Sequence, residues 1–244
     1  MEFTCKDKIK LVAFDLDGTL TQHKYPLDEK NKKVLLELQK KYKLLMVGAG
    51  TCTRIFNQLE KFPIDIIGNY GLQQAVYDPA IQDIKIVKNL VFDCDKEVVE
   101  ERITRLRKKF NLLNFTGDSV QYHESGAVTF PILGTKAQLE DKLKYDPTRE
   151  KRRPMYNDVK NAFPEYTVFI GGSSSFDMAP QGYNKFVALD SYCKENNLTH
   201  QNVAFVGDDY GVGGNDNAVY ESDFPFIKVD NYLNFEDVMN KTLL

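Results

Sequence analysis

The sequence is poor in several residue types that would point to particular classes of protein. Its 244 residues include no tryptophan, three histidines and four cysteines, which are Cys5, Cys52, Cys94 and Cys193. The cysteines form no CxxC pair, and no histidine lies near them at metal-ligand spacing. This scatter argues against a zinc site or a disulfide framework and predicts reduced thiols.

Long apolar runs and an excess of charge of one sign are absent as well. No window approaches the roughly 18 consecutive apolar residues of a membrane span, and residues 1–10 lack the apolar stretch of a signal peptide. The 32 basic and 35 acidic side chains give a net charge of −3, with one dense basic run at 149–154. We therefore expect a cytoplasmic protein without a membrane or nucleic-acid partner, and the sequence carries no indication of its oligomeric state.

What is present is an alternation of short apolar runs and helical patterns over the first 70 residues. Residues 9–14, 43–47 and 64–68 have the pattern of buried strands, and 27–42 and 53–62 that of helices. Strands that alternate with helices favour a parallel sheet covered by helices.

The middle of the chain has a different order of elements. A helical pattern at 96–110 and a long polar stretch at 136–163 accompany four expected strands, at 119–123, 127–133, 166–171 and 175–179. The alternation then returns, with a helix at 186–197, strands at 203–207 and 224–229, and a closing helix near 235–243. We expect an α/β fold with a Rossmann-like core, residues 1–84 and 185–244, interrupted by an α+β cap at 85–184.

Two carboxylates stand where the first expected strand ends, in the stretch AFDLDGTLT. Asp15 and Asp17 follow the apolar run, Gly18 permits a tight turn and Thr19 can anchor it. In open α/β sheets ligands bind outside the carboxyl ends of the strands. Two unpaired carboxylates about 4 Å apart repel by roughly 4 kcal/mol at an effective dielectric near 20, so a divalent cation is the best candidate to neutralise them.

A second acidic group follows another expected strand, in VAFVGDDYGVGGND. Asp208 and Asp209 come directly after the strand, and Asp216 lies eight positions after Asp208 across a glycine-rich loop. Carboxylates from separate segments, with no histidine among them, suit hard oxygen ligation of Mg²⁺. A further DxD, at Asp93 and Asp95, lacks the Gly-Thr turn, and we expect Asp95 to cap the following helix instead.

These motifs together resemble the haloacid dehalogenase superfamily of phosphohydrolases. The resemblance rests on DLDGT, a threonine after the second strand, a lysine near the middle of the chain and GDD with GGND, over the first 70 residues and from about residue 170 onward. It implies that Asp15 is the nucleophile, forming an aspartyl-phosphate, and that Asp17 is the general acid and base. It also implies Mg²⁺ held by Asp15, the Asp17 carbonyl, Asp208 and Asp216.

The same resemblance implies further roles for residues outside the acidic motifs. Thr51 matches the hydroxyl that binds phosphoryl oxygens, and Lys185 matches the family lysine, whose positive charge suits phosphoryl transfer. Within the superfamily, GNYGLQQAVY and GGSSSFDMAPQGYNK are similar to eukaryotic-type phosphomannomutases of the C2-capped branch. That similarity implies substrate contacts at Lys24, Gly50, Ser175, Asp177 and Asn215.

The similarity to the mutases departs in the cap. The mutase pattern has two arginines that grip a substrate phosphate, and His123 and Gly134 stand in their places. A charge-assisted contact with phosphate contributes roughly 1.5–3 kcal/mol, so we expect a weak second phosphate site and favour a sugar-phosphate phosphatase. Lys136 or the basic run at 149–153 could supply substitute charge, so a phosphomannomutase remains the alternative.

Three other interpretations fit parts of the sequence. VGAGTC resembles the start of a dinucleotide-binding loop, but Thr53 replaces its third glycine. The serines of GGSSSF lack a GxSxG elbow, which favours turn or substrate contacts over a nucleophilic role. A non-catalytic phosphate-binding or receiver-like module would also pair acids with a threonine and a lysine, but it would need neither Asp17 nor Asp216.

Overall fold

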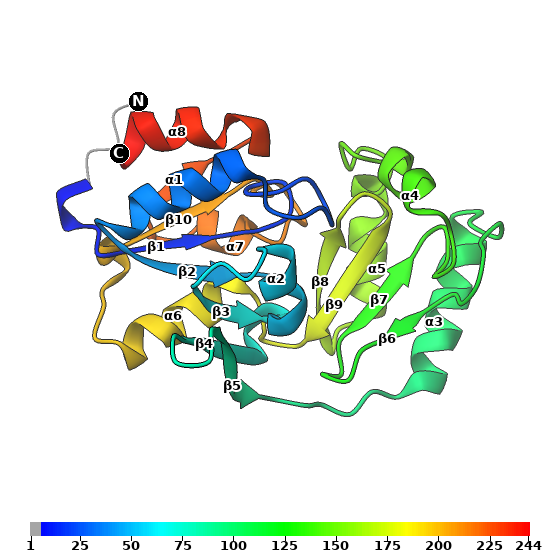
Figure 1. The fold of residues 1–244 in the computed structure, drawn as a ribbon. Helices are drawn as coiled ribbons and strands as arrows, with labels where there is room; N and C mark the ends of the chain where they lie inside the picture. The colour runs from blue at the N-terminus through cyan, green and yellow to red at the C-terminus, as the bar shows by residue number, and fades with distance from the viewer. Residues whose placement is uncertain (1–5) are drawn as a thin grey trace. The chain divides into compact units, whose positions relative to one another are not determined.

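The computed structural model describes residues 6–244, so Cys5 lies outside the described residues. The chain forms two compact units. The first comprises the chain up to Asn89 together with Asn184–Gly211 and Asp216–Leu244, and the second comprises Leu90–Tyr183 and Val212–Asn215. A parallel-dominated sheet in the first unit and a separate antiparallel sheet in the second confirm the predicted α/β fold class (Figure 1).

The first unit is built on a seven-stranded sheet. In spatial order its strands are β11 (Phe226–Lys228), β10 (Val203–Gly207), β1 (Leu11–Phe14), β2 (Lys43–Val47), β3 (Asp65–Gly68), β4 (Gln73–Asp78) and β5 (Asp83–Asn89). The five strands from β11 to β3 pair in parallel. β4 and β5 instead add an antiparallel hairpin, which the helix-strand alternation did not predict.

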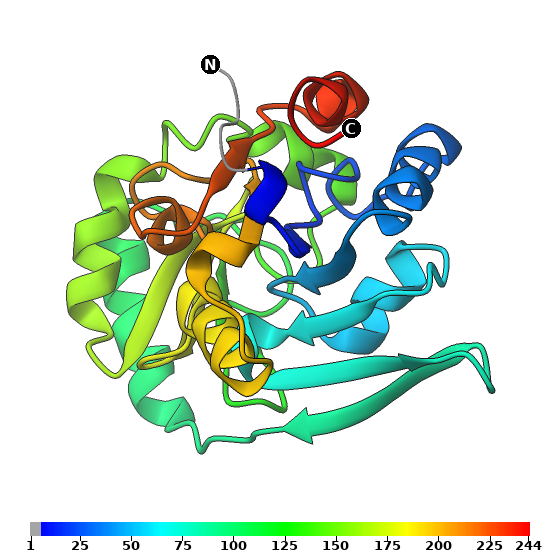
Figure 2. The ribbon, with the colours of Figure 1, turned by 90° about the vertical axis from the view of Figure 1, so that its left-hand side faces the viewer.

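Helices cover both faces of this sheet because successive strand residues point to opposite sides. Val12, Phe14 and Met46 belong to the apolar cluster that includes α1 (Glu29–Gln39), α2 (Cys52–Gln58) and α8 (Phe235–Thr242). Their neighbours Leu11, Ala13 and Leu45 pack instead with α6 (Lys185–Glu195) and α7 (Asn217–Tyr220). Figure 2 shows α1, in blue, and α6, in yellow, on opposite sides of the sheet.

The second unit is a four-stranded antiparallel sheet with helices on one face. Its spatial order is β6 (Gln121–Tyr122), β7 (Val128–Pro131), β9 (Ser175–Pro180) and β8 (Tyr166–Gly171). Residues of α3 (Lys96–Lys109) and α5 (Tyr156–Ala162) share an apolar cluster with β7, β8 and β9, and α4 (Leu139–Tyr145) buries none of its side chains. Asp95 caps α3 as predicted, since its side chain accepts a hydrogen bond from the Val98 amide at 3.2 Å.

Short 3-10 turns complete the described chain. They are η1 (Lys6–Lys8), η2 (Asn69–Gly71), η3 (Arg153–Met155), η4 (His200–Asn202) and η5 (Tyr232–Asn234). Cys52, Cys94 and Cys193 are free, as expected. Within residues 6–244, no helix combines the length and the apolar character that crossing a membrane requires.

Candidate active site

Parallel pairing brings the two acidic segments of the first unit together. β1 and β10 are adjacent and parallel, with Phe14 opposite Val206, so both strands end at the same edge of the sheet. Asp15 follows β1 directly, and its amide donates to the Val206 carbonyl at 2.9 Å. Asp208 follows β10. Carboxylates that are far apart in the sequence therefore meet at one edge because the sheet fixes the register.

A buried lysine joins two of these acids. Lys185 is the first residue of α6, where Asn184 caps the helix by accepting from the Val187 amide at 2.9 Å. The Lys185 side chain is 0% exposed, and its Nζ donates to Asp15 Oδ1 at 2.5 Å and to Asp216 Oδ1 at 2.7 Å. The lysine that the resemblance implies thus lies within contact of the predicted nucleophile.

Asp15, Asp208 and Asp216 form a group of potential metal ligands. Each offers one carboxylate oxygen, and these oxygens lie within 4.8 Å of one another. Lys185 pairs with two of them, and three ionised carboxylates with one ammonium carry a net charge of −2. Several carboxylate oxygens with a deficit of two positive charges suit Mg²⁺, which prefers hard oxygen ligands.

The turn after β1 shapes the position of Asp208. Gly18 has a φ of +101°, and a Cβ at this residue would lie 2.6 Å from Asp208 Oδ2. The Thr19 hydroxyl donates to Asp208 Oδ1 at 3.1 Å. The Gly-Thr pair of the motif therefore makes room for the Asp208 carboxylate and holds it, which fits a residue that must face a cation.

The surroundings of Asp15 and Lys185 shift both pKa values. The pKa of Asp15 is raised to about 6, because burial and the neighbouring charge of Asp216 together outweigh the opposing effect of Lys185. Burial alone would lower the pKa of Lys185, but the carboxylates of Asp15 and Asp216 outweigh it and raise that pKa, so the lysine is charged. A bound divalent cation would favour the ionised form of Asp15, as a nucleophile requires.

Asp17 lies outside this carboxylate group and faces α2. Its Oδ1 accepts from the Lys24 amide at 2.7 Å and from Gln58 Nε2 at 2.8 Å, and its Oδ2 accepts from Arg54 Nη2 at 3.1 Å. Burial would raise the pKa of Asp17, but His23 and Arg54, aided by these hydrogen bonds, lower it overall. Its side chain is not part of the metal-ligand group, so a contribution to the ion would come from its main-chain carbonyl.

The predicted phosphate and substrate contacts of the first unit lie in two loops. Thr51 is the N-cap of α2, and its hydroxyl accepts from the Arg54 amide at 3.2 Å. A Cβ at Gly50 would lie 2.3 Å from Arg54 Nε, so the arginine side chain passes directly over this glycine. Lys24 has a left-handed φ of 64° and contacts Asp17 through its amide. The binding roles of Thr51, Gly50 and Lys24 stay predictions.

The remaining predicted substrate contacts belong to the second unit. Asp177, on β9, accepts from the Thr129 hydroxyl at 3.0 Å and from the Ser175 hydroxyl at 3.4 Å. Ser175 also donates to the Gly171 carbonyl at 3.1 Å. Asn215 lies in the short segment Val212–Asn215, which clusters with this unit. Ser175 and Asp177 thus form one polar cluster on the sheet, and their role in binding stays a prediction.

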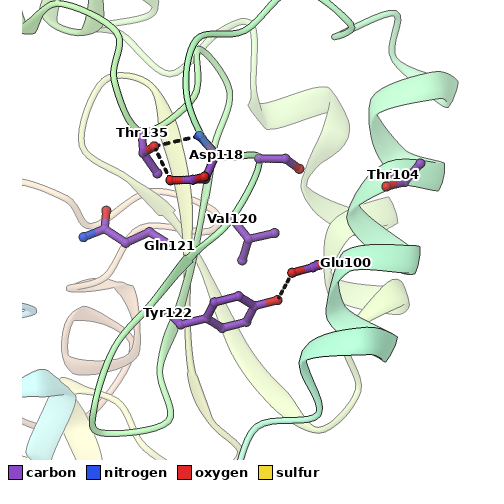
Figure 3. Close-up of a pocket in the computed structure, with 8 residues that line it drawn as sticks. Glu100, Thr104, Asp118, Val120, Gln121, Tyr122 and Thr135 are labelled. Atoms are coloured by element: carbon purple, nitrogen blue, oxygen red, sulfur yellow. Dashed lines mark hydrogen bonds between the residues drawn. The ribbon is translucent and has the colours of Figure 1, made fainter.

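A separate groove of about 770 Å³ lies in the second unit, beside α3 and β6 (Figure 3). Two pairs of its lining side chains are hydrogen-bonded: the Thr135 hydroxyl donates to Asp118 Oδ2 at 3.1 Å, and Tyr122 donates to Glu100 at 3.3 Å. The residues that line it include none of the predicted catalytic, metal-binding or substrate-binding residues. The groove is therefore distinct from the candidate active site.

Sequence reasoning missed Arg54 and Gln58. Both stand on α2 four positions apart, on the same side of the helix, and both contact Asp17. The signal was present, because two polar residues at i and i+4 shortly after an N-cap threonine share one face. Which loop that face would meet depends on tertiary packing.

Comparison with known proteins shows that this chain is similar to phosphoryl-transfer enzymes. The model of a family described as eukaryotic phosphomannomutase matches residues 31–227. A phosphomannomutase of Saccharomyces cerevisiae is 26% identical over 233 residues, which cover 90% of this chain and 88% of the relative. A phosphomannomutase of Spinacia oleracea is 28% identical over 225 residues, covering 87% of each.

Solved structures share the fold at lower sequence identity. An IMP-nucleotidase of Plasmodium falciparum aligns with a TM-score of 0.74 and 16% identity, over 97% of this chain and 68% of that one. A haloacid dehalogenase-like hydrolase of B. subtilis aligns with a TM-score of 0.59 and 16% identity, over 87% and 86%. Mutases and hydrolases thus both appear among the similar proteins.

Proposed function

Because the chain belongs to the eukaryotic phosphomannomutase family, within the haloacid dehalogenase superfamily of phosphoryl-transfer enzymes, we propose that it is a Mg²⁺-dependent phosphatase. Its substrate in this proposal is a phosphate monoester, most simply a sugar phosphate. The reaction proceeds through an aspartyl-phosphate on Asp15. The second unit acts as the cap that selects the substrate.

One observation carries this proposal: Asp15, Asp208 and Asp216 lie together, with Asp15 and Asp216 buried and paired to the fully buried Lys185 and Asp208 partly buried. An ion pair that only stabilises a fold consists of one acidic and one basic side chain. Three carboxylates this close repel one another by several kcal/mol unless cations offset their charge. Keeping that arrangement in a protein core favours a functional site over a stabilising one.

The proposed reaction assigns a step to each group. Asp15 attacks phosphorus, the bond to the leaving oxygen breaks, and Asp17 protonates that oxygen. Because its surroundings lower the pKa of Asp17, this carboxyl must take up a proton before this step. Lys185 orients the Asp15 carboxylate and offsets negative charge. Mg²⁺, held by Asp15, Asp208, Asp216 and the Asp17 carbonyl, would neutralise charge on the transferred group. Asp17 then takes a proton from the water that releases phosphate.

We favour hydrolysis over the mutase reaction because of the arginines of the second unit. Its two buried arginines are already committed to the fold. Arg152 is 0% exposed, pairs with Asp146 at 2.9 Å and donates to the carbonyls of Gly171, Gly172 and Ser175. Arg107 donates to four backbone carbonyls, among them Pro131 at 2.6 Å. Neither guanidinium is available to grip a second phosphate, and Arg152 belongs to the basic run that could have supplied substitute charge.

Phosphomannomutase activity is the second candidate, because the matched family and the relatives from yeast and spinach carry that name. In that reaction the phosphoryl group on Asp15 would pass to a second position of the sugar instead of to water. The exposed Lys136 could then supply the missing charge. A non-catalytic phosphate-binding module is the alternative of another class.

A single product analysis separates these functions. The purified chain is given mannose 1-phosphate, a bisphosphate activator and Mg²⁺, and both inorganic phosphate and mannose 6-phosphate are measured. We expect inorganic phosphate, lost on addition of a chelator and in Asp15→Asn. Mannose 6-phosphate without phosphate release would establish the mutase, and binding without turnover across a panel of phosphate monoesters would establish the non-catalytic module.

A further inference from the structure

Two side chains of α2 form a clamp on Asp17. Arg54 and Gln58, here called the α2 clamp, stand four residues apart, and Arg54 Nη1 donates to Gln58 Oε1 at 2.9 Å. The clamp reaches both carboxylate oxygens of Asp17, Gln58 contacting Oδ1 at 2.8 Å and Arg54 contacting Oδ2 at 3.1 Å. Three hydrogen bonds thus close a ring between the helix and the loop after β1.

Neighbouring residues hold the α2 clamp and Asp17 in place. Gly50 leaves the space over which Arg54 passes, since a Cβ there would lie 2.3 Å from Arg54 Nε. Gln58 Nε2 also donates to the Thr21 hydroxyl at 2.9 Å, which ties the clamp to the end of the DLDGTLT segment. From the loop after β1, the Lys24 amide also donates to Asp17 Oδ1 at 2.7 Å. The rotation of the Asp17 carboxylate is therefore fixed from two sides.

We propose that Arg54 and Gln58 are positioning residues that orient the Asp17 carboxylate toward the water that breaks down the aspartyl-phosphate; this inference rests on the proposed phosphatase function. In that step the water oxygen attacks phosphorus, and the bond from phosphorus to the Asp15 oxygen breaks with its electron pair returning to Asp15. Asp17 takes the proton from the water. The products are inorganic phosphate and the free carboxylate of Asp15.

The geometry favours this role over a role in stability. Arg54 has a side chain that is 41% exposed, and exposed ion pairs contribute little to folding. A base must hold its acceptor oxygen within hydrogen-bond reach of one particular proton, and a misplacement of about 1 Å can cost on the order of a hundredfold in rate. Loss of the clamp should therefore affect phosphoenzyme breakdown much more than the melting temperature.

The test uses p-nitrophenyl phosphate, whose leaving group departs without help from a general acid. Wild type, Arg54→Ala, Gln58→Ala and the double variant are mixed rapidly with this substrate and Mg²⁺, and p-nitrophenolate is followed from the first turnover. Asn57→Ala is the matched control, because Asn57 is an exposed residue of the same helix. Arg54→Lys tests rescue by a conservative change, and melting temperatures confirm folding.

We expect the clamp variants to release about one equivalent of p-nitrophenolate in a burst, followed by a steady rate lower by about tenfold or more, because breakdown becomes limiting. Intact-mass spectra should show phosphoenzyme accumulating in these variants. Arg54→Lys should recover part of the steady rate, and Asn57→Ala should match wild type.

The experiment distinguishes failure of the clamp proposal from failure of the proposed phosphatase function. If clamp variants keep the wild-type steady rate without added phosphoenzyme, or lose burst and steady rate equally, the clamp does not position the base. If the wild type itself releases no product from p-nitrophenyl phosphate or from sugar phosphates with Mg²⁺, the proposed phosphatase function fails instead.

Discussion

Replacing Lys185 with methionine should destabilise the protein strongly and make its stability depend on Mg²⁺. Methionine keeps most of the buried aliphatic volume but removes the ammonium that contacts Asp15 at 2.5 Å and Asp216 at 2.7 Å. Breaking a buried pair by removing one partner costs about 3–5 kcal/mol. For a protein of about this size each kcal/mol lowers the melting temperature by about 2–4 °C, so we expect a fall of about 6–20 °C.

The assay is thermal unfolding with a chelator or with excess Mg²⁺. The matched control is Lys194→Met, on the same helix, where the lysine is 74% exposed and pairs with Asp190 at 2.6 Å; its loss should cost less than about 1 kcal/mol. Mg²⁺ should raise the melting temperature of Lys185→Met more than that of wild type, because the carboxylates then lack their own cation. Equal melting temperatures for the two methionine variants would refute the reasoning.

Three further outcomes are expected. Gly18→Ala should raise the Mg²⁺ concentration needed for half-maximal activity by about tenfold, since its Cβ would lie 2.6 Å from Asp208 Oδ2. Burial would lower the pKa of His200, but Asp223 and Asp190 outweigh burial and raise this pKa in the folded protein. The two contacts therefore stabilise the fold fully below pH 6.5, near the pKa of an unfolded histidine, and this stabilisation is lost as pH rises through the raised pKa. His200→Gln should therefore cost more stability at about pH 6 than at about pH 9 in urea titrations. A chelator should abolish turnover in a coupled phosphate assay, and Mg²⁺ should restore it.

Each of these three predictions can be contradicted by a specific result, and the Gly18→Ala prediction also has a matched control. Gly182→Ala is matched to Gly18→Ala, because Gly182 has a φ of +88° but no atom within 4 Å of its ideal Cβ; equal Mg²⁺ requirements in the two variants would contradict the assigned role of Gly18. A destabilisation by His200→Gln that is the same at both pH values would contradict the raised pKa. Turnover that survives the chelator would contradict metal dependence.

The local pattern of the sequence was enough to place the acids of the core. Apolar runs ending in DLDGT and in GDD marked two strand ends, and the parallel pairing of β1 with β10 brings Asp15 and Asp208 together. The same reasoning separated Asp95 from them, because a DxD that leads into a helical pattern caps a helix, as the Val98 contact confirms. Strand ends are predictable because apolar periodicity and turn residues are local signals.

Features that depend on long-range packing were not predictable in this way. The β4–β5 hairpin pairs residues on an exposed sheet edge, where apolar alternation is weak. The contact of Arg54 with Asp17 joins positions 37 residues apart, and nothing within α2 shows which loop its polar face will meet. Arg152 has the sequence environment of a solvated basic run, yet it is fully buried beside Asp146. In each case the tertiary partner, and not the local pattern, decides the role.

The central claim is that Asp15 accepts a phosphoryl group, and mapping the phosphoenzyme tests it most directly. The chain is mixed with Mg²⁺ and a phosphate monoester, quenched in acid, and treated with borohydride, which reduces an acyl phosphate to an alcohol. Trypsin should then yield the peptide of residues 11–24, in which Asp15 and Asp17 are the only acidic residues.

We predict that Asp15 is converted to homoserine in this peptide and that Asp17 is unchanged. The conversion should disappear when Mg²⁺ or the substrate is omitted. Reduction at Asp17, or phosphate found on a serine or histidine elsewhere while Asp15 stays intact during turnover, would contradict the account.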